Sequence, residues 1–338
     1  MHRPRLSRRA FVRLFLLGGI GAGAAYIQHQ TAGIGLLNLL RWSIRGQLLR
    51  LKPPAIVGLA KCDSYDGDLL SPLRNLWNIS EMPAIEGKNV FLKLNMLDTV
   101  QNNIATTNPK LFSAVLDLLS ELGAKSVAVG DGSFFRRDTY SVARNTGIID
   151  ITDAHTLPFI DLNYDELVKV KVRDGWIRNT DYLWLPRHVV EADLIISIPK
   201  LKTHHWAGVT LSLKNLLGVI PGSRYGWAKN IIHFNGINAT ILGVYQSLPP
   251  VVSIVDGIIG MEGNGPVFGE PVQHGLLAMG RDPLAVDVTC AQLMGFAIDT
   301  IPHLSGAALA GVGQAQRIET RGTPPEQLQK YYQPAPTI

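Results

Sequence analysis

The segment LIISIPKLKTHHWAGVTLSLKNLLGVIPG, residues 194–222, joins a strand-like apolar run to a dense group of polar side chains. Residues 194–198 consist of Leu and Ile with one Ser, which is typical of a strand covered on both faces of a parallel sheet. Pro199 ends this run, and three lysines and two adjacent histidines follow it. Ligands of open α/β sheets bind beyond the carboxyl ends of strands, so this position predicts a ligand site. Taken alone, the segment also fits an ordinary basic surface loop.

Comparable apolar runs recur along the chain and alternate with segments of helical periodicity. Strands are predicted at 56–61, 90–94, 126–129, 194–198, 251–255 and 276–279, and helices at 110–122, 230–246, 283–294 and 302–310. Alternation of strands and helices favours parallel pairing with right-handed crossovers. We therefore expect an α/β fold in three layers, with a mainly parallel sheet and helices on both of its faces.

The segment 159–185 departs from this alternation. From 168 to 173 valines alternate with basic residues, and Asp174-Gly175 then gives the signal of a hairpin turn. The pattern predicts a small antiparallel insertion near 159–185.

The first residues resemble an export signal. Residues 7–13 read SRRAFVR, and an uncharged stretch rich in Gly and Ala follows from 14 to 27. Paired arginines before an apolar stretch are typical of the twin-arginine route, so we expect the twin-arginine export machinery as a partner. The protein would then be periplasmic, or anchored on the outer side of the cytoplasmic membrane if the leader is not cleaved. The alternative is a basic tail that leads into a buried helix.

Residues 36–51 mix apolar positions with Arg41, Arg45 and Arg50. This pattern predicts a basic amphipathic helix, which can lie on an anionic membrane surface or pack on the body of the protein. Four regions follow along the chain: a signal peptide or anchor at 1–30, the basic helix or linker at 31–52, the α/β domain at 53–315 and a C-terminal tail at 316–338.

Composition excludes several classes of protein. The chain has 338 residues, 46% of them apolar, and a net charge of +5, but the first 52 residues hold nine basic and no acidic side chains. The body is therefore not basic enough to suggest a nucleic-acid partner. Its two cysteines, Cys62 and Cys290, are far apart, so no iron–sulfur cluster is expected from this chain. Two buried free thiols are favoured over a single disulfide.

Polar residues follow five of the predicted strands, and a parallel sheet would bring them to one edge. The fifth group, Gly280-Arg281-Asp282-Pro283, also fits a helix cap. The candidate site residues in or after the other four groups are Lys93, Asn95, Asp131, Lys200, Lys202, His204, His205, Lys214, Asn215, Asp256 and Glu262.

These side chains suit a small anionic ligand. Lysines neutralise carboxylates and phosphates, so Lys93, Lys200, Lys202 and Lys214 are expected to hold the anion or an anionic cofactor, together with Asn95, Asp131 and Asn215. Histidines transfer protons near neutral pH. Because neighbouring residues of a strand point to opposite sides, we expect only one of His204 and His205 to reach the site.

Two carboxylates lead to a second hypothesis, which is a metal site. His204, Asp256 and Glu262 are candidate ligands of a divalent metal, and Glu262 is also a candidate acid or base. The alternatives are that Asp256-Gly257 is only a turn, and that Lys214 is an exposed lysine on a helix.

Five motifs together resemble the domain-of-unknown-function 362 family. They are VFLKLN (90–95), TTNPKLFSAVLDLLSELGAKSVAVGDGS (106–133), ADLIISIPKLKTHHWAGVTLSLKNLLGVIPG (192–222), VDGIIGMEGNGPVFGEP (255–271) and MGRDPLAVDVTCAQLMG (279–295). The resemblance covers about 56–313. Some members of that family carry an appended ferredoxin-like cysteine cluster, which this chain lacks.

A shorter stretch, 202–222, is similar to one in the nickel-pincer lactate racemase family. The similarity implies that Lys214 tethers or contacts a cofactor, and that His204 or His205 is a metal ligand or an acid/base group. Ser212-Leu213 replaces the Gly-Gly that precedes the lysine in that family. The expected function is thus a cell-envelope enzyme with isomerase-like or redox chemistry on a small anion, with a metal or organic cofactor. The alternative is a non-catalytic protein that binds an anion or cofactor, or assists cofactor maturation.

Overall fold

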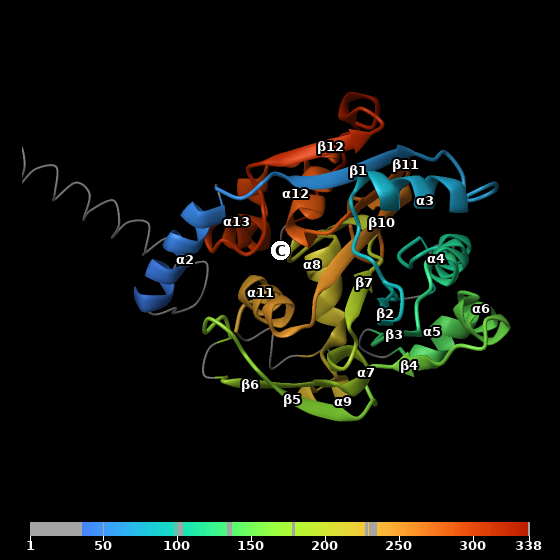
Figure 1. Ribbon diagram of the computed structural model, residues 1–338, viewed down its shortest axis with the longest axis horizontal. Coiled ribbons are helices and arrows are strands. Elements are labelled where there is room, and N and C mark those ends of the chain that lie inside the picture. Colours follow the sequence, from blue (N-terminus) through green and yellow to red (C-terminus); the bar gives the residue numbers. More distant parts are fainter. Residues whose placement is uncertain are drawn as a thin grey trace, which may run out of the picture.

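A computed structural model describes residues 36–49, 51–97, 99, 104–133, 137–177, 180–226, 229 and 235–336. Within these ranges ten strands form one sheet, in the order β12-β1-β11-β10-β7-β2-β3-β4, with β8 beside β10 and β9 beside β8 (Figure 1). The strands are β1 (Ala55–Lys61), β2 (Asn89–Lys93), β3 (Ser126–Asp131), β4 (Phe159–Asp161), β7 (Leu194–Ser197), β8 (Lys200–His204), β9 (Gly208–Thr210), β10 (Val251–Glu262), β11 (Glu270–Gly280) and β12 (Ile318–Gly322).

The sheet is mainly parallel. Strands β10, β7, β2, β3 and β4 run in the same direction, whereas β11 is antiparallel to both of its neighbours. The carboxyl end of β11 therefore lies at the opposite edge from the carboxyl ends of the parallel strands. The prediction that residues 280–283 join the polar edge is wrong for this reason. Asp282 instead caps a helix and accepts a hydrogen bond from the backbone N–H of Leu284 at 3.0 Å.

Helices cover both faces, so the predicted three layers are confirmed (Figure 1). Successive residues of a strand point to opposite faces. In β2, Val90 and Leu92 pack on one face and Phe91 packs on the other. The first face is covered by α3 (Leu70–Ile79), α4 (Pro109–Glu121), α5 (Thr139–Asn145) and α6 (Ile148–Ala154). The second is covered by α8 (Ser212–Asn215), α11 (Ile237–Ser247), α12 (Pro283–Leu293) and α13 (Pro302–Leu309).

Shorter helical segments connect these elements. They are α7 (Arg187–Val190), α9 (Gly222–Tyr225) and the 3-10 turns Leu216–Val219, Ile298–Thr300 and Pro325–Gln327.

The predicted insertion is a separate two-stranded antiparallel ribbon of β5 (Leu167–Lys171) and β6 (Tyr182–Pro186). Its bounds are narrower than expected, because 159–161 pairs in parallel with β3 and belongs to the main sheet. Asp174 and Gly175 adopt the positive φ angles, 58° and 62°, that the hairpin signal predicts. They lie within a longer connection, so they do not close the ribbon as a two-residue turn.

The segment 316–338 is not a tail outside the domain, contrary to prediction. Its strand β12 pairs in parallel with β1, from Ala55↔Ile318 to Leu59↔Gly322, and forms an edge of the sheet. Further along, Tyr332 is buried, and its hydroxyl lies 3.0 Å from Nδ1 of His274. The domain therefore extends through most of this segment.

Helix α2 (Leu36–Leu49) packs on the body through one face. The ring of Trp42 is buried and stacks on Trp176 with centroids 4.2 Å apart, and Arg45 pairs with Asp174 at 2.7 Å. Elsewhere on this helix, the side chain of Ile44 is 52% exposed. The packed alternative thus holds for one face of this helix.

The predicted twin-arginine segment, 1–30, lies outside the described residues. Among the helices that are described, none is both long enough and apolar enough to span a bilayer. Cys62 and Cys290 are free thiols, as expected, but only Cys290 is buried, whereas Cys62 is half-buried.

Candidate functional site

A cavity of about 350 Å³ lies at the carboxyl ends of β2, β3 and β8. Its walls include seven of the predicted site residues: Lys93, Asn95, Asp131, His204, His205, Lys214 and Asn215. The cavity is within the size range of small-molecule sites. The polar ends of parallel strands do meet at one place, as the sequence predicts.

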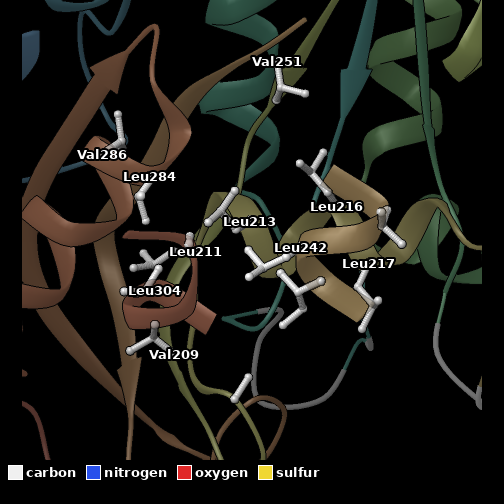
Figure 2. Packing of buried hydrophobic residues seen from close by; sticks show 14 of the residues in the cluster. Val209, Leu211, Leu213, Leu216, Leu217, Leu242, Val251, Leu284, Val286 and Leu304 are labelled. Carbon is white, nitrogen blue, oxygen red and sulfur yellow. The ribbon is translucent and has the colours of Figure 1, made fainter. Parts of the chain in front are cut away.

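The short helix α8 positions Lys214. Its apolar neighbours, among them Leu211, Leu213 and Leu216, are buried in a cluster with α11, α12 and α13 (Figure 2). The start of α8 has no local side-chain cap. Asp287 of α12 takes that role, because its two carboxylate oxygens accept hydrogen bonds from the backbone N–H groups of Ser212 and Leu213, each at 2.8 Å. Burial raises the pKa of Asp287 to about 7.

Lys93 and Asp131 form a buried ion pair in the wall of the cavity. Lys93 Nζ donates to Asp131 Oδ1 at 2.7 Å and to the carbonyl of Leu94 at 2.6 Å. The backbone N–H groups of Met96 and Gly132 also donate to Asp131, at 2.6 and 2.7 Å. Burial lowers the pKa of Lys93, and Asp131 opposes that shift. Both groups have several partners, so this pair is a fixed part of the wall.

Lys214 differs from Lys93, because its ammonium has no hydrogen-bond or ion-pair partner among the described residues. Burial lowers its pKa to about 8, and the positive charge of Lys93 adds to the shift. The alternative of an exposed helix lysine is therefore wrong: Lys214 lines the cavity and is only partly accessible.

A third lysine, Lys229, was not predicted. Its Nζ donates to the carbonyls of Gly218 at 3.0 Å and Gly132 at 3.3 Å. Burial lowers its pKa to about 7, and Lys93 and Lys214 add to that shift while Asp131 opposes it. Its sequence context, SRYGWAKN, has no strand-end pattern, so only its basic character could have marked it.

Both histidines line the cavity, so the prediction that only one reaches the site is wrong. The alternation rule applies within strands, and His204 is the last residue of β8 whereas His205 lies in the turn before β9. Their rings stack with centroids 5.0 Å apart.

The two rings present opposite hydrogen-bonding groups. Nδ1 of His204 accepts from the backbone N–H groups of Trp206 at 3.1 Å and Ala207 at 3.3 Å, so the neutral ring carries its proton on Nε2. Nδ1 of His205 lies 3.0 Å from the carbonyl of Gly265, which only accepts, so in the neutral ring this Nδ1 carries the proton and Nε2 has the lone pair. Burial and the nearby Lys214 charge lower the pKa of His204 well below its usual value. The pair thus offers one donor and one acceptor.

Lys200 and Asp256 do not line the cavity, contrary to prediction. Lys200 Nζ donates to Asp256 Oδ2 at 3.0 Å and to the hydroxyl of Tyr65 at 2.6 Å. The Tyr65 hydroxyl donates to the other Asp256 oxygen at 2.5 Å, and the backbone N–H of Asn108 donates to Oδ2 at 2.8 Å. All three side chains satisfy one another in a closed buried network.

Lys202 and Glu262 also lie outside the cavity wall. Lys202 is fully buried and donates to the carbonyl of Ala105 at 2.6 Å. Burial lowers its pKa well below the usual value, and Lys214 and Lys200 add to the shift. Glu262 accepts from the backbone N–H of Gln333 at 2.8 Å, so its predicted catalytic role is not supported.

The metal hypothesis for His204, Asp256 and Glu262 is wrong. Asp256 is held by Lys200, and Glu262 lies at the end of β10 outside the cavity. Across the described ranges, no group of three or more His, Cys, Asp or Glu side chains could hold a metal ion.

Apolar residues complete the mouth of the cavity. Trp206 and Phe268 are 51% and 61% exposed, and both line it. The cavity also contains buried hydroxyl groups of Ser133 and Thr210 that have no hydrogen-bond partner within the described part of the chain. Such buried groups normally find partners, so the wall retains unused hydrogen-bonding capacity.

Comparisons with known proteins identify the family of this chain, but they do not identify a reaction. A thylakoid-associated protein of Synechocystis sp. is 30% identical over 270 residues, which cover 76% of this chain and 79% of that protein. A solved Thermotoga maritima protein is 13% identical with a TM-score of 0.40, over 64% of this chain and 56% of that one. The lactate racemase apoprotein of Thermoanaerobacterium thermosaccharolyticum is 13% identical with a TM-score of 0.44, over 72% and 58%.

This chain thus spans little more than half the length of either solved protein, and likenesses so distant carry no argument about activity. The family evidence is much stronger. Residues 90–292, well over half of the chain, match the family described as Domain of unknown function (DUF362). The chain belongs to this family.

Proposed function

We propose that the chain is an enzyme that binds a small organic anion in the cavity and moves a proton on it. The observation that carries the proposal is the Lys214 ammonium, which has no partner among the described residues and lies in the same cavity as a donor–acceptor pair of histidines.

Charge imbalance supports an anionic ligand. Lys93, Lys214 and Lys229 line the cavity, and Asp131 is the one acidic side chain among the described residues of its wall. Burial lowers the pKa of all three lysines, which means that their positive charges are poorly solvated. A carboxylate or phosphate would stabilise these charges, and each unit of pKa that it restores contributes about 1.4 kcal/mol to binding.

The histidine pair supports catalysis beyond binding. His204 carries an N–H and His205 a lone pair on Nε2 of the neutral ring, and both residues line the same cavity. A donor and an acceptor at one site can stabilise charge on one ligand atom while a proton is removed from another. Asp287 fixes the helix that carries Lys214, so the lysine and the histidines are held by separate elements.

A cofactor bound by this chain would be an organic anion that the lysines hold, rather than a metal held by protein side chains alone. The acidic and imidazole groups of the described residues do not converge on a metal position. Lys214, which has no partner among the described residues, is the residue that fits a covalent or ionic contact with such a cofactor.

The site of action that we propose is the outer surface of the cytoplasmic membrane, after twin-arginine export. The SRRAFVR motif at 7–13 supports export. On α2, exposed Arg41 and Ile44 support contact with an anionic membrane, and the relative from Synechocystis is described as thylakoid-associated. A reporter fused to residues 1–30 should be exported, and replacing Arg8 and Arg9 by Lys should block its export. Export of the Lys–Lys form would contradict the route.

The anion proposal is tested by thermal unfolding with pyruvate, malate, oxalate, inorganic phosphate and glycerol phosphate. At least one should raise the unfolding midpoint of the wild type and leave that of Lys214→Gln unchanged. Lys125→Gln, a change at an exposed lysine outside the cavity, is the matched control and should behave as the wild type. If no anion acts through Lys214, the proposed site is wrong.

Proton transfer is tested by deuterium incorporation. Each stabilising carbon acid is incubated with protein in D₂O and followed by proton NMR. Exchange should be lost in His205→Gln while binding remains. An anion that binds without exchange would identify the site as a binding site and contradict the enzyme proposal.

A further inference from the structure

The lysines of the cavity differ in how many partners hold them. Lys93 donates to Asp131 and to the carbonyl of Leu94, and Lys229 donates to two backbone carbonyls. Lys214 donates to none of the described residues. Two of the lysines are therefore held in place by partners in the wall, and the third has a side chain that is free to meet a ligand.

We propose that Lys214 is a nucleophile that condenses with the carbonyl group of a 2-oxo acid, forming an imine in the cavity. This inference rests on the proposed anion site and names its substrate class. The carboxylate of the oxo acid would lie against Lys229, which donates to two carbonyls and has a third ammonium proton to give, and the adjacent carbonyl carbon would then lie near Lys214.

The reactive form of the amine is accessible at neutral pH. An amine attacks carbonyl groups only when it is unprotonated, and lysines become nucleophiles when burial or a second cation lowers their pKa. Burial and Lys93 both lower the pKa of Lys214, to about 8. Roughly a tenth of Lys214 is then unprotonated at pH 7.

The histidines supply the proton transfers that condensation requires. A C–N bond forms as the carbonyl π bond breaks, and the Nε2–H of His204 stabilises the developing oxyanion by a hydrogen bond. The Nε2 lone pair of His205 takes the two amine protons in turn and delivers them to that oxygen. The C–O bond breaks, the oxygen leaves as water and the C=N bond remains. The step is balanced without an oxidant or reductant.

Pyruvate is the probe, because it is a small 2-oxo acid. Wild-type protein is incubated with pyruvate and sodium cyanoborohydride, which reduces an imine to a stable secondary amine. Intact-mass measurement should show one added 1-carboxyethyl group, and peptide mapping should place it on Lys214. Oxalate, which has two carboxylates but no ketone, should compete and suppress the reaction.

Two arginine variants serve as matched controls. Lys214→Arg keeps the positive charge and cannot condense, so its trapping rate should fall at least tenfold while oxalate still binds. Lys125→Arg, a change at an exposed lysine outside the cavity, should still be trapped on Lys214. The trapping rate of the wild type should rise as pH increases from 6 to 8, as Lys214 loses its proton.

The outcomes separate this inference from the proposed function. If oxalate binds through Lys214 but pyruvate is trapped on Lys229, on surface lysines or not at all, the imine is wrong and the anion site stands. If neither oxalate nor any of the other anions, pyruvate included, binds through Lys214, the proposed function fails, and trapping on Lys214 should then be absent as well.

Discussion

Gly218 lies directly against the ammonium of Lys93: a Cβ atom built on Gly218 would stand 2.7 Å from Lys93 Nζ and 2.9 Å from Asp131 Oδ1. A glycine is required here because the ion pair fills the space that a side chain would occupy. The carbonyl of the same Gly218 accepts a hydrogen bond from Lys229 at 3.0 Å. One backbone position therefore contacts two lysines of the cavity and sets the space between them.

We expect Gly218→Ala to weaken anion binding at least tenfold, because the new methyl group must displace the Lys93–Asp131 pair. The displaced buried pair should also lower the free energy of unfolding by about 1–3 kcal/mol. Titration calorimetry with oxalate and urea unfolding measure the two effects. Gly306→Ala is the control, since its Cβ would meet only Leu242 at an ordinary 3.5 Å. Equal effects of the two substitutions would contradict the close packing described for Gly218.

Lys214→Met should stabilise the protein at pH 7, by about 1–3 kcal/mol, although it should abolish anion binding. The folded-state pKa of Lys214, about 8, lies below the usual 10.5. The unfolded chain therefore binds more protons between pH 8 and 10.5, so stability from this group is lost as pH falls through that window. The free energy of unfolding should therefore rise less between pH 8 and pH 10 in Lys214→Met than in the wild type.

Urea unfolding at pH 7 and pH 10 measures this change. Lys125→Met, at an exposed position, provides the comparison. Its free energies of unfolding at pH 7 and pH 10 should lie within about 0.5 kcal/mol of the wild-type values. A loss of stability in Lys214→Met at pH 7 would mean that the lysine is a structural residue.

The parallel part of the fold could be predicted from sequence because each buried strand is a short apolar run. That pattern places 90–94, 126–129 and 194–198 correctly in the sheet. It does not reveal strand direction, so the polar residues after β11 were assigned to the wrong edge. Edge strand β12, with the sequence IETRG, has little apolar character and gives no such signal.

The residue types of the site could be predicted from the sequence, but the side chains that each residue contacts could not. Lys93 and Lys200 look alike in sequence, since each stands at or just after a buried strand. The difference is that Tyr65, from a loop 135 residues earlier, reaches Lys200 and closes a network around it. Contacts of this kind depend on the tertiary fold, and periodicity carries no information about them. Lys229 was missed for a related reason, because only folding brings its loop to the cavity.

Anion affinity should fall as pH rises from 6 to 9. Lys229 and Lys214 have pKa values of about 7 and 8, lowered mainly by burial, and the anion binds their protonated forms. Binding should therefore raise both pKa values and take up protons from solution in this range. Calorimetric titration with oxalate in buffers of different ionisation enthalpy measures the uptake directly. Proton release, or affinity that is constant from pH 6 to 9, would contradict this assignment of charge.

Lys200→Met should destabilise the fold without altering the site. It leaves the fully buried carboxylate of Asp256 without its cationic partner, which should lower the free energy of unfolding by about 3–5 kcal/mol. The Tyr65 hydroxyl and the backbone N–H of Asn108 would still donate to Asp256, so the loss should lie at the lower end of that range.

The matched variant is the double substitution Lys200→Met with Asp256→Leu. It removes both charges, so no uncompensated ion remains, and it should recover much of the lost stability. Oxalate affinity of the folded single variant should equal that of the wild type, because neither residue lines the cavity. A selective loss of anion binding in Lys200→Met would return this lysine to the site, and the buried network would then serve the ligand as well as the fold.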